Sequence, residues 1–176
     1  MNWKKLGTKI TYQNPYFSVE EADVIRPDNS RSVYYTVLNR KGVGVIAYDG
    51  NKVLMVNQYR IPIEKRIWSF VAGGAEHVDL LEDAKRELLE EAGFTAQKWT
   101  LLGTFPTSPS LTDQTNHIYI AEGLIEGQHV REAGEMDMEV AFFTFEEVDE
   151  LIEKGELSAF DISDFYMFKK YLEKNK

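Results

Sequence analysis

An amphipathic helix over residues 80–92 is the feature that most constrains how this chain folds. Leu81, Ala84 and Leu88 recur at helical spacing, and good helix formers occupy the positions between them. Gly93 follows directly, in the place where glycine readily ends a helix. This helix is the strongest structural prediction in the sequence.

Short strands are predicted on both sides of the helix. Near the N-terminus, β-rich runs broken by turn formers predict a small antiparallel sheet at residues 9–12, 17–20 and 33–37. A hairpin of buried strands follows at residues 42–48 and 52–58. Later strands are expected at 98–105, 117–121 and 140–145, and helices at 145–154 and 163–174. The predicted fold class is α/β, with an N-terminal β-sheet segment at 1–41 and a main domain at 42–176.

Composition restricts the function classes. The 176 residues are 43% hydrophobic and 28% charged, with no apolar run of membrane length and no signal segment, so we expect a cytoplasmic globular protein. The absence of cysteine excludes disulfides, thiolate catalysis and sulfur-bound metals. A net charge of −9 argues against nucleic-acid or membrane partners. A site for phosphates on so acidic a protein should place divalent cations between carboxylates and substrate.

The predicted helix carries an unusual acidic face. Asp83, Glu87 and Glu91 are four residues apart, and Glu90 lies beside them. Like charges at this spacing destabilise a helix by roughly 0.2–0.5 kcal/mol per pair, and a bound cation would relieve the repulsion. The alternative is a solvated helix in which neighbouring bases soften it.

The neighbourhood of this face resembles the Nudix family. Ala72-Gly73-Gly74 precedes the helix, and the family signature has Gly, five residues, Glu, seven residues, then R-E-U-x-E-E-x-G-U, where U is a bulky apolar residue. Its second half is matched in full by residues 86–94. In the first half, Asp79 or Glu76 stands in for the Glu, and the loop is one residue short.

The resemblance implies an α/β/α sandwich with a mixed sheet and a site for Mg²⁺, with Mn²⁺ as a substitute. Glu87 and Glu91 would be the principal metal ligands, assisted by Glu90 and by the backbone carbonyl of Ala72. Arg86 would orient these carboxylates through charge-assisted hydrogen bonds. The general base is expected in the acidic loop before Val140. Glu135 is the first candidate, and Glu132 and Asp137 are the alternatives.

Features outside the signature resemble ADP-ribose pyrophosphatases and imply a nucleoside diphosphate sugar as substrate. They are Gln58-Tyr59-Arg60 with Pro62 and Trp68, then Ser108-Pro109, and the N-terminal sheet through which such enzymes form homodimers. Expected substrate-binding residues are Arg60, Gly74, Ser110 and Phe17. Arg60 offers a guanidinium fork to phosphate, although a surface arginine is an equal alternative, and Phe17, Tyr34 or Tyr35 would stack on a base unless they pack in a core.

Three alternatives stay open from the sequence. Ser69-Phe70-Val71-Ala72-Gly73 and Ser108-Pro109-Ser110 depart from the subgroup's E-x-P-A-G and S-P-G, which leaves a substrate such as GDP-mannose open. The short loop leaves open a module that binds a nucleotide sugar without cutting it. A triphosphate hydrolase would share the signature without needing the N-terminal sheet.

His77, in the short loop, is within reach of a phosphate but is also typical of an exposed loop residue.

Overall fold

The structure, a computed structural model, describes residues 2–127 and 136–175. These residues form two compact units. The first comprises residues up to 41 together with 105–116, and the second comprises 42–104 and the described residues after 116. The predicted division at residue 41 assigns the segment 105–116 to the main domain. It joins the first unit because its backbone pairs with the N-terminal sheet, for example through Val37 N–H donating to Leu111 O at 2.8 Å.

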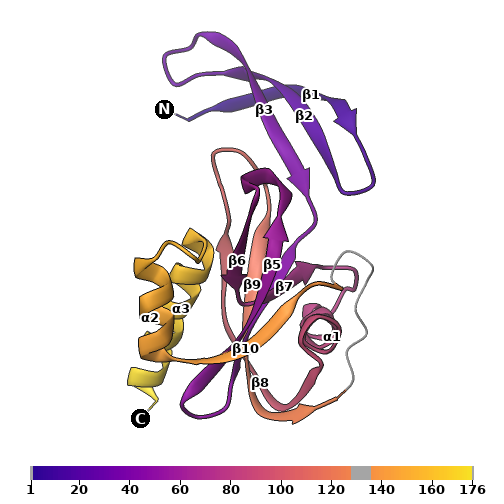
Figure 1. The fold of residues 1–176 in the computed structure, drawn as a ribbon. Helices are drawn as coiled ribbons and strands as arrows, with labels where there is room; N and C mark the ends of the chain where they lie inside the picture. Colours follow the sequence, from indigo (N-terminus) through magenta and orange to yellow (C-terminus); the bar gives the residue numbers. More distant parts are fainter. Residues whose placement is uncertain (1, 128–135, 176) are drawn as a thin grey trace. The chain divides into compact units, whose positions relative to one another are not determined.

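The N-terminal unit is a three-stranded antiparallel sheet in the order β1-β2-β3 (Figure 1). The strands are β1 (Lys4–Gln13), β2 (Phe17–Ile25) and β3 (Arg31–Asn39). Asn14 closes the first turn, because its Oδ1 accepts hydrogen bonds from the backbone of Tyr16 and Phe17. Every residue of β1 is exposed, whereas Ala22 and Val24 of β2 are buried. The predicted small sheet is confirmed, with longer strands.

The second unit is built on a seven-stranded sheet. Its path runs β10-β5-β4-β9-β8, with β6 paired to β5 and β7 paired to β4. The strands are β4 (Gly42–Tyr48), β5 (Lys52–Arg60), β6 (Lys65–Ser69), β7 (Val71–Gly74), β8 (Phe94–Pro106), β9 (Thr115–Glu126) and β10 (Glu139–Thr144). A short 3-10 helix, η1 (Ile61–Ile63), connects β5 to β6. In this way β7 brings Ala72 and Gly73 beside Gly44 and Val43 of the buried strand β4.

Helices cover both faces of this sheet (Figure 1). α1 (Leu80–Ala92) lies on one face and contributes Ala84, Leu88 and Ala92 to a core with Val45 and Leu54. α2 (Phe145–Glu153) and α3 (Ala159–Lys174) lie on the other face. The arrangement confirms the predicted α/β sandwich. None of the helices in residues 2–127 and 136–175 is both long and apolar enough to span a membrane.

Local capping explains where the helices begin and end. α1 begins after Asp79, whose side chain accepts from Leu81 N–H, and ends at Gly93, whose φ of 75° favours glycine. α3 begins at Ala159, four residues before the predicted start at Ser163, because Ser158 and Asp161 form a capping box. β6 and β7 were not predicted, since strands this short carry no clear periodicity.

Candidate metal-binding and catalytic site

The acidic face of α1 is turned toward the sheet instead of solvent. Glu87 and Glu91 are 7% and 4% exposed, and Asp83 is fully buried. Glu91 Oε2 accepts a hydrogen bond from Ala72 N–H of β7 at 3.2 Å. Burying a carboxylate is unfavourable unless hydrogen bonds or cations compensate it. These positions are therefore unlike those of an ordinary solvated acidic helix.

Gly73 allows the helix to approach β7 this closely. A Cβ atom built at residue 73 would lie closer than 3.0 Å to Cδ and both carboxylate oxygens of Glu87, whereas a Cβ at Gly74 would meet nothing within 4 Å. The Glu87 carboxylate thus occupies the space that any side chain at residue 73 would need. Of the two glycines, Gly73 is the one that the packing requires.

Arg86 joins the acidic residues to the strand. Its Nη1 donates to Glu90 Oε2 at 2.6 Å, and its Nη2 donates to Glu87 Oε1 at 2.7 Å and to Gly74 O at 3.2 Å. Burial lowers the pKa of Arg86, but Glu87 and Glu90 more than offset this and raise it, so the guanidinium stays charged. The Arg86 guanidinium therefore orients two of the predicted metal ligands, Glu87 and Glu90, and also holds the end of β7.

Asp83 organises the shortened loop before α1. It accepts hydrogen bonds from the backbone N–H groups of Glu76 at 3.0 Å and His77 at 3.1 Å, and from the His77 ring at 2.7 Å. Burial raises the pKa of Asp83, yet these hydrogen bonds lower it overall. Asp79, one of the two candidates for the missing Glu, instead caps the helix. Sequence reasoning noted Asp83 on the acidic face but assigned it no role in the loop.

The donor chemistry of this face suits a hard divalent cation, because all the candidate ligands are carboxylate or carbonyl oxygens. In the present side-chain arrangement, no three His, Asp or Glu side chains among the described residues converge tightly enough to hold a metal ion. Arg86 engages Glu87 and Glu90 instead, and supplies the neutralising charge. The residues fit a metal by type and burial, and their role as ligands stays a prediction.

The predicted substrate-binding residues are distributed over both units. Arg60 ends β5, and its guanidinium has no hydrogen-bond or ion-pair partner among the described residues, which leaves it available to an anion. In the N-terminal unit, the Phe17 ring packs against Tyr12 at 5.7 Å between centroids, and Ser110 O accepts from Tyr34 Oη at 2.7 Å.

The predicted base, Glu135, and its alternative Glu132 lie outside the described residues. The other alternative, Asp137, is described, and its Oδ2 accepts a hydrogen bond from Arg66 Nη1 at 2.7 Å. The Asp137 carboxylate is therefore engaged by Arg66 in this structure.

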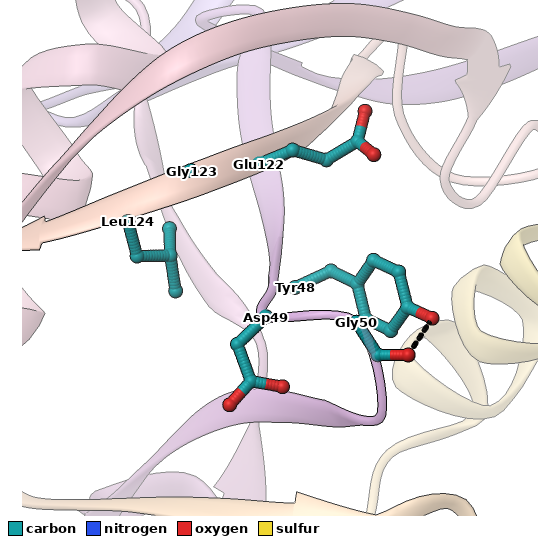
Figure 2. Close-up of a pocket in the computed structure, with 6 residues that line it drawn as sticks. All are labelled: Tyr48, Asp49, Gly50, Glu122, Gly123 and Leu124. Carbon is teal, nitrogen blue, oxygen red and sulfur yellow. Dashed lines mark hydrogen bonds between the residues drawn. The ribbon is translucent and has the colours of Figure 1, made fainter.

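A separate pocket of about 440 Å³ lies at the β4–β5 turn and β9 (Figure 2). Its lining includes the carboxylates of Asp49 and Glu122 and, among its six residues, no cationic side chain. Asp49 accepts from Lys52 N–H at 2.8 Å, and Glu122 pairs with Lys98 at 2.6 Å. This lining has no counterpart of Arg86, whose guanidinium supplies positive charge at the α1 face, so the α1 face is the better candidate for a diphosphate.

Comparison with known proteins identifies the family. A model of the NUDIX domain matches residues 38–164. The chain belongs to the Nudix family. A second model, of the nucleoside diphosphate sugar hydrolase N-terminal domain, matches residues 3–37, so the N-terminal sheet and the Nudix domain are both accounted for.

Individual relatives agree with this assignment. An ADP-ribose pyrophosphatase of Bacillus subtilis (strain 168) is 37% identical over 157 residues, which cover 88% of this chain and 85% of the relative. A methanol dehydrogenase activator of Bacillus methanolicus is 36% identical over 123 residues, which cover 69% of this chain and 66% of the relative. A crystal structure of an ADP compounds hydrolase superposes with a TM-score of 0.89 at 21% identity, covering 99% of this chain and 96% of that one. The last comparison shows that the two chains share a fold.

Proposed function

We propose that the protein hydrolyses the pyrophosphate bond of a nucleoside diphosphate sugar, with ADP-ribose as the preferred substrate and a nucleoside monophosphate and a sugar phosphate as products. The observation that carries this proposal is the pair of buried carboxylates, Glu87 and Glu91, held against the backbone of β7 within a Nudix signature. The similarity to an ADP-ribose pyrophosphatase over most of both chains supports the choice of substrate.

In this proposal Mg²⁺, or Mn²⁺ as a substitute, is held by Glu87 and Glu91 with help from Glu90 and the carbonyl of Ala72. A bound divalent cation neutralises the diphosphate and acidifies a water molecule. Arg86 orients Glu87 and Glu90, and its hydrogen bond to Gly74 O fixes the strand relative to the helix. Arg60 binds a phosphate oxygen, and Gly74, Ser110 and Phe17 complete the substrate contacts. Glu135 accepts the proton of the attacking water.

The test is a panel of nucleotide sugars and nucleoside triphosphates incubated with magnesium, with products identified by chromatography. ADP-ribose should yield AMP and ribose 5-phosphate, excess EDTA should stop the reaction, and magnesium should restore it. Preferential hydrolysis of a triphosphate or of GDP-mannose would refute the choice of substrate. Turnover that survives chelation would refute the metal chemistry.

A second candidate function is regulation of another enzyme by a nucleotide-binding module without hydrolysis. The similarity to a methanol dehydrogenase activator favours it. The panel separates the two, because a binding module would bind ADP-ribose in calorimetry and leave it intact.

We further infer that the protein acts in the cytoplasm as a homodimer formed through the N-terminal sheet. The support is the apolar surface of β1, β3 and the residue before β1: Trp3, Leu6, Ile10, Tyr12 and Tyr35 are each about half exposed. A small sheet with apolar groups in water gains stability from a partner that covers them. Sedimentation at micromolar concentration should show a dimer, and a monomer would contradict this inference.

A further inference from the structure

The chain changes its strand partner between β6 and β7. β6 ends at Ser69 with β5 as its partner, and β7 begins at Val71 with β4 as its partner. The pairing of backbone groups is therefore interrupted at Phe70, which lies between the two strands. This interruption is only two residues before Ala72, whose carbonyl is a predicted metal ligand.

Two contacts with α3 hold the chain at Phe70. Its N–H donates to Oδ1 of Asp161 at 2.9 Å, and its ring centroid lies 6.4 Å from that of Phe165, one helical turn further along α3. All three residues are buried. A hydrogen bond to a carboxylate is stronger than one between neutral groups, and a buried site strengthens it further. α3 thus supplies the fixed point that the strand pairing lacks at Phe70.

The capping of α3 does not account for the whole Asp161 side chain. The capping box uses Oδ2, which accepts from the N–H and the hydroxyl of Ser158. This box needs one side-chain acceptor at the position of Asp161. Oδ1 is the second acceptor, and it is used by Phe70 on a different element.

A second carboxylate holds the same segment from α1. Ala72 N–H donates to Oε2 of Glu91 at 3.2 Å. Because α1 and α3 lie on opposite faces of the sheet (Figure 1), buried carboxylates from both faces hold backbone amides that are two residues apart. Val71, the residue between them, is fully buried in the core, so a shift of the backbone at Phe70 is transmitted to Ala72.

We propose that Asp161 is a positioning residue for the metal site. By accepting the Phe70 N–H, it holds the carbonyl of Ala72 in the place where this carbonyl and Glu91 bind a divalent cation. The proposal rests on the proposed function, since it concerns the metal that the proposed reaction uses.

The test compares two variants that both weaken the cap of α3. Asp161→Ala also removes the acceptor of Phe70, whereas Ser158→Ala keeps it. Magnesium affinity is measured by calorimetry without substrate, after circular dichroism has verified the fold. Asp161→Ala should bind magnesium about ten-fold less tightly than the parent, the usual effect of removing a partner behind a metal ligand. Ser158→Ala should stay within about twofold of the parent, because the cap lies away from the metal site. Equal magnesium affinities in the two variants overturn the proposal.

A second measurement uses the parent protein and does not depend on how a variant folds. Coupling between two sites is reciprocal, so magnesium should slow the hydrogen exchange of the Phe70 amide if the Asp161 contact supports metal binding. The matched control is the amide of Lys52 in the β4–β5 turn, which also donates to an aspartate, Asp49, at 2.8 Å. An unchanged exchange rate at Phe70 under saturating magnesium, or an equal slowing at Lys52, overturns the proposal.

The same titrations separate this proposal from the proposed function. A parent protein that binds magnesium but leaves ADP-ribose intact refutes the proposed reaction, while the role of Asp161 is still decided by the two variants. A parent that cleaves ADP-ribose, with equal magnesium affinities in Asp161→Ala and Ser158→Ala, refutes the role of Asp161 alone. A parent that binds no magnesium refutes both.

Discussion

Replacement of Gly73 by alanine tests whether the position of Glu87 matters for catalysis. The added methyl group would lie closer than 3.0 Å to three atoms of the Glu87 carboxylate group, well inside van der Waals contact. The carboxylate must leave this position, because Gly73 is fixed in β7 by its pairing with Val43 of β4. Its hydrogen bond with Arg86, now 2.7 Å, would be lost.

The magnitudes separate stability from activity. The clash involves the far end of a flexible side chain, so the free energy of unfolding should fall by only about 1–2 kcal/mol, out of the roughly 5–15 kcal/mol typical of a domain. Loss of one metal ligand from its place should lower kcat/KM by about a hundredfold or more, which corresponds to about 2.7 kcal/mol of transition-state stabilisation. Magnesium affinity should fall as well.

The assays are urea unfolding, steady-state hydrolysis of ADP-ribose and magnesium titration. Gly74→Ala is the matched control for magnesium affinity, because a Cβ at residue 74 meets nothing within 4 Å and its carbonyl remains available to Arg86. That variant should bind magnesium within about twofold of the parent. If Gly73→Ala turns over substrate as fast as the parent protein, Glu87 is not required in its observed position and the assignment of the metal site fails.

Three further predictions concern carboxylates. Glu91→Gln should abolish turnover with the fold intact by circular dichroism, whereas Glu82→Gln, on the exposed side of α1, should not; activity within a few-fold of the parent contradicts ligation by Glu91. Glu135→Gln should lower kcat by about a hundredfold or more with little change in KM, and an unchanged kcat places the base elsewhere. Burial and the charge of Asp161 raise the pKa of Asp164 to about 7. Because the folded state then favours the neutral acid, the free energy of unfolding should fall as the pH rises from about 4 to about 7. Asp164→Asn should remove this dependence and gain at most about 4 kcal/mol over the parent at pH 8, measured by urea titration. A pH profile that the substitution leaves unchanged refutes the shift.

Much of the fold and the family could be predicted from local sequence. The bounds of α1 and β4 were predicted to the residue, because a continuous hydrophobic pattern and turn-forming ends are written within each segment. The signature spacing within residues 86–94 led to the Nudix family, which the comparisons confirm. These features depend on residues that are close together in the chain.

Tertiary structure alone decided the features that depend on distant residues. β7 is only four residues long, and it becomes a strand because β4 pairs with it. The requirement for Gly73 follows from Glu87 on another element, and the residues 105–116 join the N-terminal unit through hydrogen bonds to β3.

The same division applies to the acidic face of α1. The sequence placed Asp83, Glu87 and Glu91 on one side of a helix. It did not show which of them would hold a loop and which would face β7. Backbone N–H groups of Glu76 and His77 reach Asp83, while Ala72 N–H reaches Glu91, and these contacts exist only once the helix has packed on the sheet. Helical periodicity thus sets the face on which a side chain lies, and packing supplies the partners that set its role.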